Sequence, residues 1–111
     1  VNSAVDMEKG ELVYKDYVNI GLAVDTSRGL VVPVLRDCDQ QSIPQIAQEI
    51  AKTAEKAKNA QYGVEDLRGG TFTISNLGAI GGTYSTPIIN HPEVAILLLG
   101  RSRKLPIVYE D

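Results

Sequence analysis

The most informative part of the sequence is residues 69–100, which read GGTFTISNLGAIGGTYSTPIINHPEVAILLLG. Residues 71–75 are rich in β-forming side chains and predict a strand that runs into a loop with three glycines, residues 76–82. Residues 94–99 form a continuous apolar run, which is typical of a fully buried strand. The turn residues at 90–93 separate this second strand from the loop.

The residues before this stretch predict a hairpin and two more strands. Short apolar segments at 1–5 and 12–14 flank a polar turn and favour a hairpin. Residues 18–24 alternate between apolar and small or polar side chains, the period of a strand with one apolar face. Residues 30–35 are largely β-branched, but Pro33 cannot donate to a ladder, so this strand is expected at an edge or with a bulge.

One helix is evident between these strands. Ser42 and Gln45 form the Ser-X-X-Gln pattern of a capping box. Apolar residues then follow at helical spacing, at positions 43, 46, 47, 50, 51, 54 and 57. The pattern ends at Asn59, a short turn is expected at 64–67, and a last strand at 106–109. The predicted fold is therefore α/β (α+β), a mixed β-sheet with one main flanking helix.

Composition bounds the class of protein. The 111 residues suffice for one small domain, and a net charge of -3 argues against a nucleic-acid-binding face. A single cysteine, Cys38, excludes a disulfide framework and a multi-cysteine zinc site, so no metal is expected. No apolar run approaches the roughly 20 residues that span a bilayer, so no membrane association is expected.

Residues 69–100 closely resemble the catalytic domain of the dihydrolipoamide acyltransferases, which serve the pyruvate, 2-oxoglutarate and branched-chain 2-oxo acid dehydrogenase complexes. Residues 19–43, NIGLAVDTSRGLVVPVLRDCDQQSI, and the helix of 43–58 are also similar to this family. The resemblance covers nearly the whole chain and is weakest over the first 15 and the last 8 residues. Because the two motifs, at residues 19–43 and 69–100, are separated by the spacing found in the family, a match by chance is very improbable.

The resemblance implies a fold, a reaction and partners. The fold would be like that of chloramphenicol acetyltransferase, with homo-oligomers built from trimers and an active site between subunits. The reaction would move an acyl group, acetyl or branched-chain, between a lipoyl dithiol and coenzyme A, the lipoyl group being attached elsewhere in the parent protein. The partners would be the dehydrogenase and dihydrolipoamide dehydrogenase components, in a bacterial cytoplasm or a mitochondrial matrix.

The resemblance also implies site residues. A thiol that attacks a thioester needs a base, and the resulting oxyanion needs a hydrogen-bond donor. The family's donor is a serine hydroxyl in the motif that matches residues 72–78, and Ser75 occupies its position. The residues after it are expected to shape a substrate channel, namely Asn76, Leu77, Gly78, Gly81 and Gly82. Tight-loop geometry is an equally good reason for these glycines.

The sequence departs from the family in one respect. The family's base lies in a His-X-X-X-Asp-Gly motif, which is absent here, and the only histidine, His91, lies in a turn without Asp-Gly in register. Residues 1–111 are therefore interpreted as a partial acyltransferase domain, truncated at both ends, without lipoyl or subunit-binding domains. The alternative is a non-catalytic, self-associating core domain derived from the same family.

Overall fold

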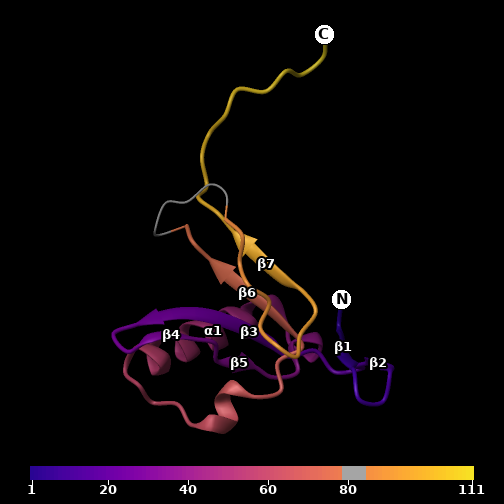
Figure 1. The fold of residues 1–111 in the computed structure, drawn as a ribbon. Coiled ribbons are helices and arrows are strands. Elements are labelled where there is room, and N and C mark those ends of the chain that lie inside the picture. Colours follow the sequence, from indigo (N-terminus) through magenta and orange to yellow (C-terminus); the bar gives the residue numbers. More distant parts are fainter. Residues whose placement is uncertain (79–84) are drawn as a thin grey trace.

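The central element of the structure, a computed structural model that describes residues 1–78 and 85–111, is a five-stranded mixed sheet. Its strand order is β4-β3-β6-β7, and β5 also pairs with β3. The strands are β3 (Ile20–Thr26), β4 (Gly29–Val31), β5 (Val34–Leu35), β6 (Phe72–Asn76) and β7 (Ile96–Leu99). Figure 1 shows β6 and β7 as neighbouring parallel arrows, with the helix α1 beside β3. The predicted mixed sheet with one main helix is confirmed.

Pro33 divides one edge strand into β4 and β5. Both halves pair antiparallel with β3, through Val24↔Val31 and Gly21↔Val34, so the register is the same on each side of the proline. The Pro33 carbonyl still accepts a hydrogen bond from the Leu22 amide at 2.9 Å, and only the return bond is missing. The edge position predicted from Pro33 is confirmed.

The first residues form a separate hairpin, as predicted. β1 (Ser3–Asp6) and β2 (Glu11–Tyr14) pair antiparallel around a turn that contains Gly10 at φ +63°. The Asn2 side chain closes the open end of the hairpin by donating to the carbonyls of Lys15 and Tyr17 at 2.8 and 2.9 Å. Figure 1 shows this hairpin to one side of the main sheet.

The predicted helix is α1 (Ile43–Lys58), and its capping box is present. The Ser42 amide donates to Gln45 Oε1 at 2.8 Å, while the Gln45 amide donates to Ser42 Oγ at 3.4 Å. α1 contacts β3 and β5 and thereby makes the crossover that a parallel pair of β3 and β6 requires. Two short 3₁₀ helices, η1 (Cys38–Gln40) and η2 (Val64–Leu67), flank α1, and η2 confirms the short turn predicted at 64–67.

A buried polar junction joins the beginnings of β3 and β6. Asn19 donates its amide to Thr71 Oγ1 at 3.1 Å, and its carbonyl accepts from the Thr71 amide at 2.7 Å. The Asn19 side chain donates to the Gly69 carbonyl and accepts from the Asp37 amide, both at 2.9 Å. Since the junction ties three segments together, it fixes where β6 begins beside β3.

Two predictions for the second half of the chain are wrong. The strand expected to be fully buried at 94–99 is β7, the last strand in the described order, and Leu97 and Leu99 are 46% and 44% exposed. Side chains point out of the plane of a sheet and are covered by a packed layer, but α1 contacts β3 and β5 at the other side of the described sheet. Residues 106–109 form no strand and are exposed, because no strand in the described part of the chain lies beside them to complete a ladder. Figure 1 shows the C-terminal segment extending away from the sheet.

A helix that spans a membrane must be long and largely apolar. Among the described residues, no helix is both long enough and apolar enough to cross a bilayer.

We predict that Asn19→Ala destabilises the chain by about 1–3 kcal/mol, because the Gly69 carbonyl and the Asp37 amide lose their partner. Urea unfolding followed by circular dichroism measures this change. The matched control is Gln48→Ala on an exposed position of α1, which should stay within about 0.5 kcal/mol. Equal midpoints for the two variants would contradict the role assigned to the junction.

Candidate functional site

The two faces of β6 differ in chemistry because side chains alternate along a strand. Phe72 and Ile74 point to one face, while Thr73 and Ser75 point to the other. Thr71, just before the strand, continues the second row and is fully buried. A row of hydroxyls therefore runs along one face of the sheet and ends at Ser75.

Ser75 is half-buried near the carboxyl end of β6. It lies between Ala23 of β3 and Leu98 of β7, its partners in the two parallel registers. Paired residues of neighbouring strands point to the same face, so the small Ala23 side chain leaves space on one side of Ser75. The strand backbone fixes the position of the Ser75 Cα and Cβ atoms and the face of the sheet to which the hydroxyl points.

The residues after Ser75 make a tight turn. Asn76 Oδ1 accepts from the Gly78 amide at 2.9 Å, and the Leu77 amide donates to the Leu99 carbonyl at 2.8 Å. A Cβ atom on Gly78 would lie 3.0 Å from Asn76 Oδ1, so glycine suits this position. Of the residues predicted to shape a channel, Asn76, Leu77 and Gly78 are thus adjacent to Ser75. Gly81 and Gly82 lie outside the described residues.

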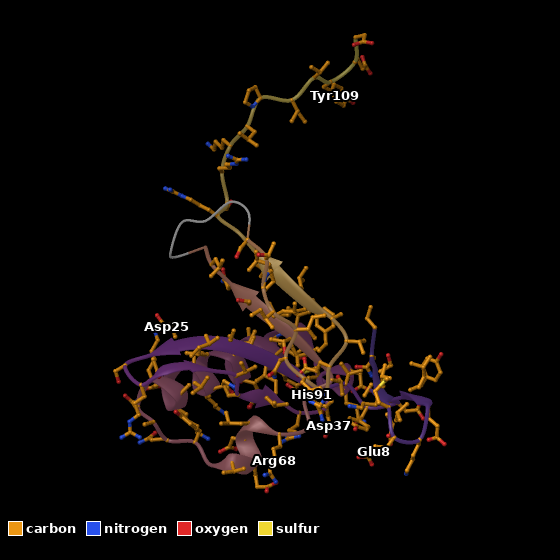
Figure 2. All side chains as sticks on the ribbon, in the orientation of Figure 1. Glu8, Asp25, Asp37, Arg68, His91 and Tyr109 are labelled. Carbon is orange, nitrogen blue, oxygen red and sulfur yellow. The ribbon has the colours of Figure 1, made fainter. Side chains whose placement is uncertain are left out.

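His91 is far along the strands from Ser75. It is exposed, in a turn before β7, as predicted for a turn histidine. Because β6 and β7 are parallel, with Ser75 opposite Leu98, the residues that precede β7 lie at the other end of β6. Figure 2 shows His91 near the base of these strands. The geometry does not bring His91 to Ser75.

Sequence reasoning missed a buried pair next to this site. Thr73 Oγ1 donates to Glu93 Oε1 at 2.5 Å, and both residues are buried. Glutamate is rarely buried without a partner. The signal in the sequence was the Thr-X-Thr-X-Ser alternation at 71–75, which marks a polar face on a strand.

Other features of the described residues lie away from Ser75. A cavity of about 230 Å³ lies between α1, β5 and the segment around Tyr62, with Val34, Leu35 and Ala57 among its lining residues. Cys38 is half-buried, and its thiol lies 3.4 Å from the Leu35 carbonyl. Among the described residues, no group of three or more His, Cys, Asp or Glu side chains is arranged to hold a metal ion.

The mixed sheet and its crossover helix place this chain in a structural class, that of α/β cores with a chloramphenicol acetyltransferase-like fold. The chain belongs to the family described as 2-oxoacid dehydrogenases acyltransferase (catalytic domain), whose model matches residues 1–111. This confirms the family inferred from the motifs of residues 19–43 and 69–100.

Relatives support the same assignment. The dihydrolipoyllysine-residue acetyltransferase component of pyruvate dehydrogenase complex from Staphylococcus aureus (strain Mu50) is 50% identical over 108 residues, which are 97% of this chain and 25% of that protein. Azotobacter vinelandii dihydrolipoamide acetyltransferase has a TM-score of 0.92 and 48% identity, over 96% of this chain and 44% of that one. The cubic core of the pyruvate dehydrogenase multienzyme complex gives the same values. The chain thus spans about a quarter of the curated relatives' length.

We predict that Gly21→Ala destabilises the chain by about 1–3 kcal/mol through overpacking. A Cβ atom on Gly21 would lie 2.8 Å from Val32 Cγ1 and 3.1 Å from Thr73 Oγ1. The control is Gly63→Ala, where the nearest atom is 4.0 Å away. Thermal unfolding compares the two, and a Gly21→Ala variant as stable as the control would contradict the close packing beside Thr73.

Proposed function

We propose that this chain forms part of the catalytic domain of a dihydrolipoamide acyltransferase and carries its oxyanion donor, Ser75. The observation that supports this most is the place of Ser75, at the end of the hydroxyl row on β6 in the segment that resembles the family's serine motif. The study of the Azotobacter vinelandii structure concerns the role of a serine, a histidine and an asparagine in catalysis by that enzyme.

The proposed reaction transfers an acyl group between a lipoyl dithiol and coenzyme A. The sulfur of one thiol attacks the thioester carbon of the other carrier, a new C–S bond forms, and the old C–S bond breaks. The proton of the attacking thiol passes through a base to the departing thiolate. Ser75 donates its hydroxyl hydrogen to the carbonyl oxygen while that oxygen carries negative charge. We propose acetyl as the acyl group, since the relatives named above are acetyltransferases.

We propose that the base for this reaction comes from a part of the parent protein outside residues 1–111. The sequence has no His-X-X-X-Asp-Gly motif, and His91 lies at the wrong end of β6. A free thiol with a pKa of about 8.5 is mostly protonated at neutral pH, so the chain alone lacks an efficient way to form the nucleophile. Asn76, Leu77, Gly78, Gly81 and Gly82 are proposed to shape the channel beside Ser75.

We also propose an assembly. Oligomers built on trimers, with the site completed between subunits, would bring this chain together with dehydrogenase and dihydrolipoamide dehydrogenase components. The likeness to a multienzyme complex core supports such an assembly. The bacterial relatives favour a bacterial cytoplasm over a mitochondrial matrix.

Ser75→Ala tests the catalytic proposal when the missing base is replaced by added imidazole. We expect imidazole to raise acetyl transfer from acetyl-coenzyme A to dihydrolipoamide above the rate without protein, and Ser75→Ala to reduce that gain by about 10²-fold. Ser102→Ala, an exposed position on the C-terminal segment, is the matched control and should keep the gain. A gain that Ser75→Ala leaves intact would refute the donor role.

A non-catalytic role as a self-associating core is the second candidate. Exposed apolar side chains on β7 and on the C-terminal segment favour it, including Leu97, Leu99, Ile107 and Val108. If the chain forms oligomers and shows no acyl transfer either with or without imidazole, this candidate is favoured over the first.

We predict that the chain is an oligomer at tens of micromolar concentration, because the exposed row on β7 is removed from water by association. Light scattering after size-exclusion chromatography measures this. Leu97→Lys should shift the population toward monomer, whereas Lys52→Ala on the exposed face of α1 should not. A monodisperse monomer of the unaltered chain would contradict the prediction.

A further inference from the structure

Glu93 and Thr73 form a buried side-chain pair near Ser75. Thr73 is 1% exposed and Glu93 is 7% exposed, although the two residues are 20 positions apart in the sequence. The Thr73 hydroxyl donates to the Glu93 carboxyl oxygen at 2.5 Å. The pair therefore links β6 to the turn that precedes β7.

Two glycines make room for this pair. A Cβ atom on Gly70 would lie 3.0 Å from Glu93 Oε2, and one on Gly21 would lie 3.1 Å from Thr73 Oγ1. Asn90 supports the carboxyl group from the turn, since its side-chain amide donates to Glu93 Oε2 at 3.3 Å and its carbonyl accepts from the Glu93 amide at 2.9 Å. Both carboxyl oxygens are thus held by hydrogen bonds.

The pair lies on the same face of β6 as Ser75 and two residues before it, about 6.6 Å along the strand. Thr73 is opposite Ile96 and Ser75 is opposite Leu98, so fixing Glu93 at Thr73 also fixes which β7 residue lies beside Ser75. A slip of β7 by one residue would turn its side chains to the other face. Such a slip would replace Leu98 as the neighbour of the Ser75 hydroxyl.

We propose that Glu93 is a positioning residue that acts through Thr73: it holds β7 in register against β6 and so keeps the Ser75 hydroxyl directed at the reacting carbonyl. The inference rests on the proposed function, because it assigns Ser75 a substrate-facing role. Glu93 does not contact the reacting atoms. Its effect is geometric, and a displacement of about 1 Å at a reacting group can cost about 10²-fold in rate.

Thr73→Val tests this by removing the hydroxyl while keeping the shape of the side chain. In the imidazole-supported assay we expect kcat to fall by about 10²-fold with KM little changed, after correction for the folded fraction. Thr73→Ser keeps the hydroxyl donor, and Glu93→Gln keeps an oxygen that can accept from it. Both variants should therefore have a kcat within a few-fold of the unaltered chain. Thr53→Val on α1, away from Ser75, is the matched control and should behave like the unaltered chain.

A second measurement reports the position of residue 75 without relying on catalysis. Ser75→Cys is introduced into a Cys38→Ser chain, so that one thiol remains, and its alkylation rate is measured by mass spectrometry. We expect Thr73→Val to change this rate several-fold and Thr73→Ser to leave it unchanged. If Thr73→Val does not fold, Asn90→Ala takes its place, because it weakens the support of Glu93 without opening the buried pair.

The outcomes separate this inference from the proposed function. If Thr73→Val changes the alkylation rate and also lowers kcat, both the positioning role of Glu93 and the proposed function are supported. Unaltered kcat and alkylation in folded Thr73→Val, or in its Asn90→Ala substitute, overturn the positioning role even when Ser75→Ala abolishes transfer. A loss in Thr73→Val that matches the Thr53→Val control also overturns it. A changed alkylation rate with Ser75→Ala fully active keeps the register role of Glu93 and refutes the donor role of Ser75.

Discussion

The hydrogen-bonded junction of Asn19 and Thr71 is the constraint on which the rest of the fold depends. Parallel neighbours such as β3 and β6 are far apart in the sequence, and a sheet by itself does not specify where one begins beside the other. The junction supplies that information with backbone and side-chain bonds in a buried place, where an unpaired polar group is costly. Once β6 is placed, the alternation of side chains along the strand puts Thr73 and Ser75 on the same face of the sheet. Ser75 then lies near the carboxyl end of the strand.

Several of the buried residues in this chain are polar, and they lie within β6 or just before β3, β6 and β7. Among the described residues, Asn19, Thr71, Thr73 and Glu93 are buried alongside the apolar Leu35 and Ala57. Many large apolar side chains remain exposed, including Leu97 at the edge strand. Buried polar networks define a geometry sharply when every member is paired, but exposed apolar surface favours association. The same sheet therefore combines a well-defined site region with surfaces suited to contact with other protein.

Local patterns in the sequence predicted most of the elements, because each carried its own physical signal. The capping box at Ser42 and Gln45 defined the start of α1, and Pro33 marked an edge strand. The errors lie where a strand depends on partners: residues 94–99 were expected to be buried and 106–109 to form a strand, yet burial and pairing are set by neighbours rather than by local sequence. The Thr73–Glu93 pair was missed for the same reason, since its two members are distant in the sequence. Ser75 could be proposed as a site residue only through the motif around it, because a serine in a strand has many structural explanations.

The central claim is that the Ser75 hydroxyl donates to the carbonyl oxygen of an acyl thioester. Infrared difference spectroscopy tests this directly, using acetyl-coenzyme A labelled with ¹³C at the thioester carbonyl and bound to the chain or to Ser75→Ala. A donated hydrogen bond polarises the carbonyl and lowers its stretching frequency. We expect a lower frequency in the unaltered chain than in Ser75→Ala. The same frequency in both would contradict the claim.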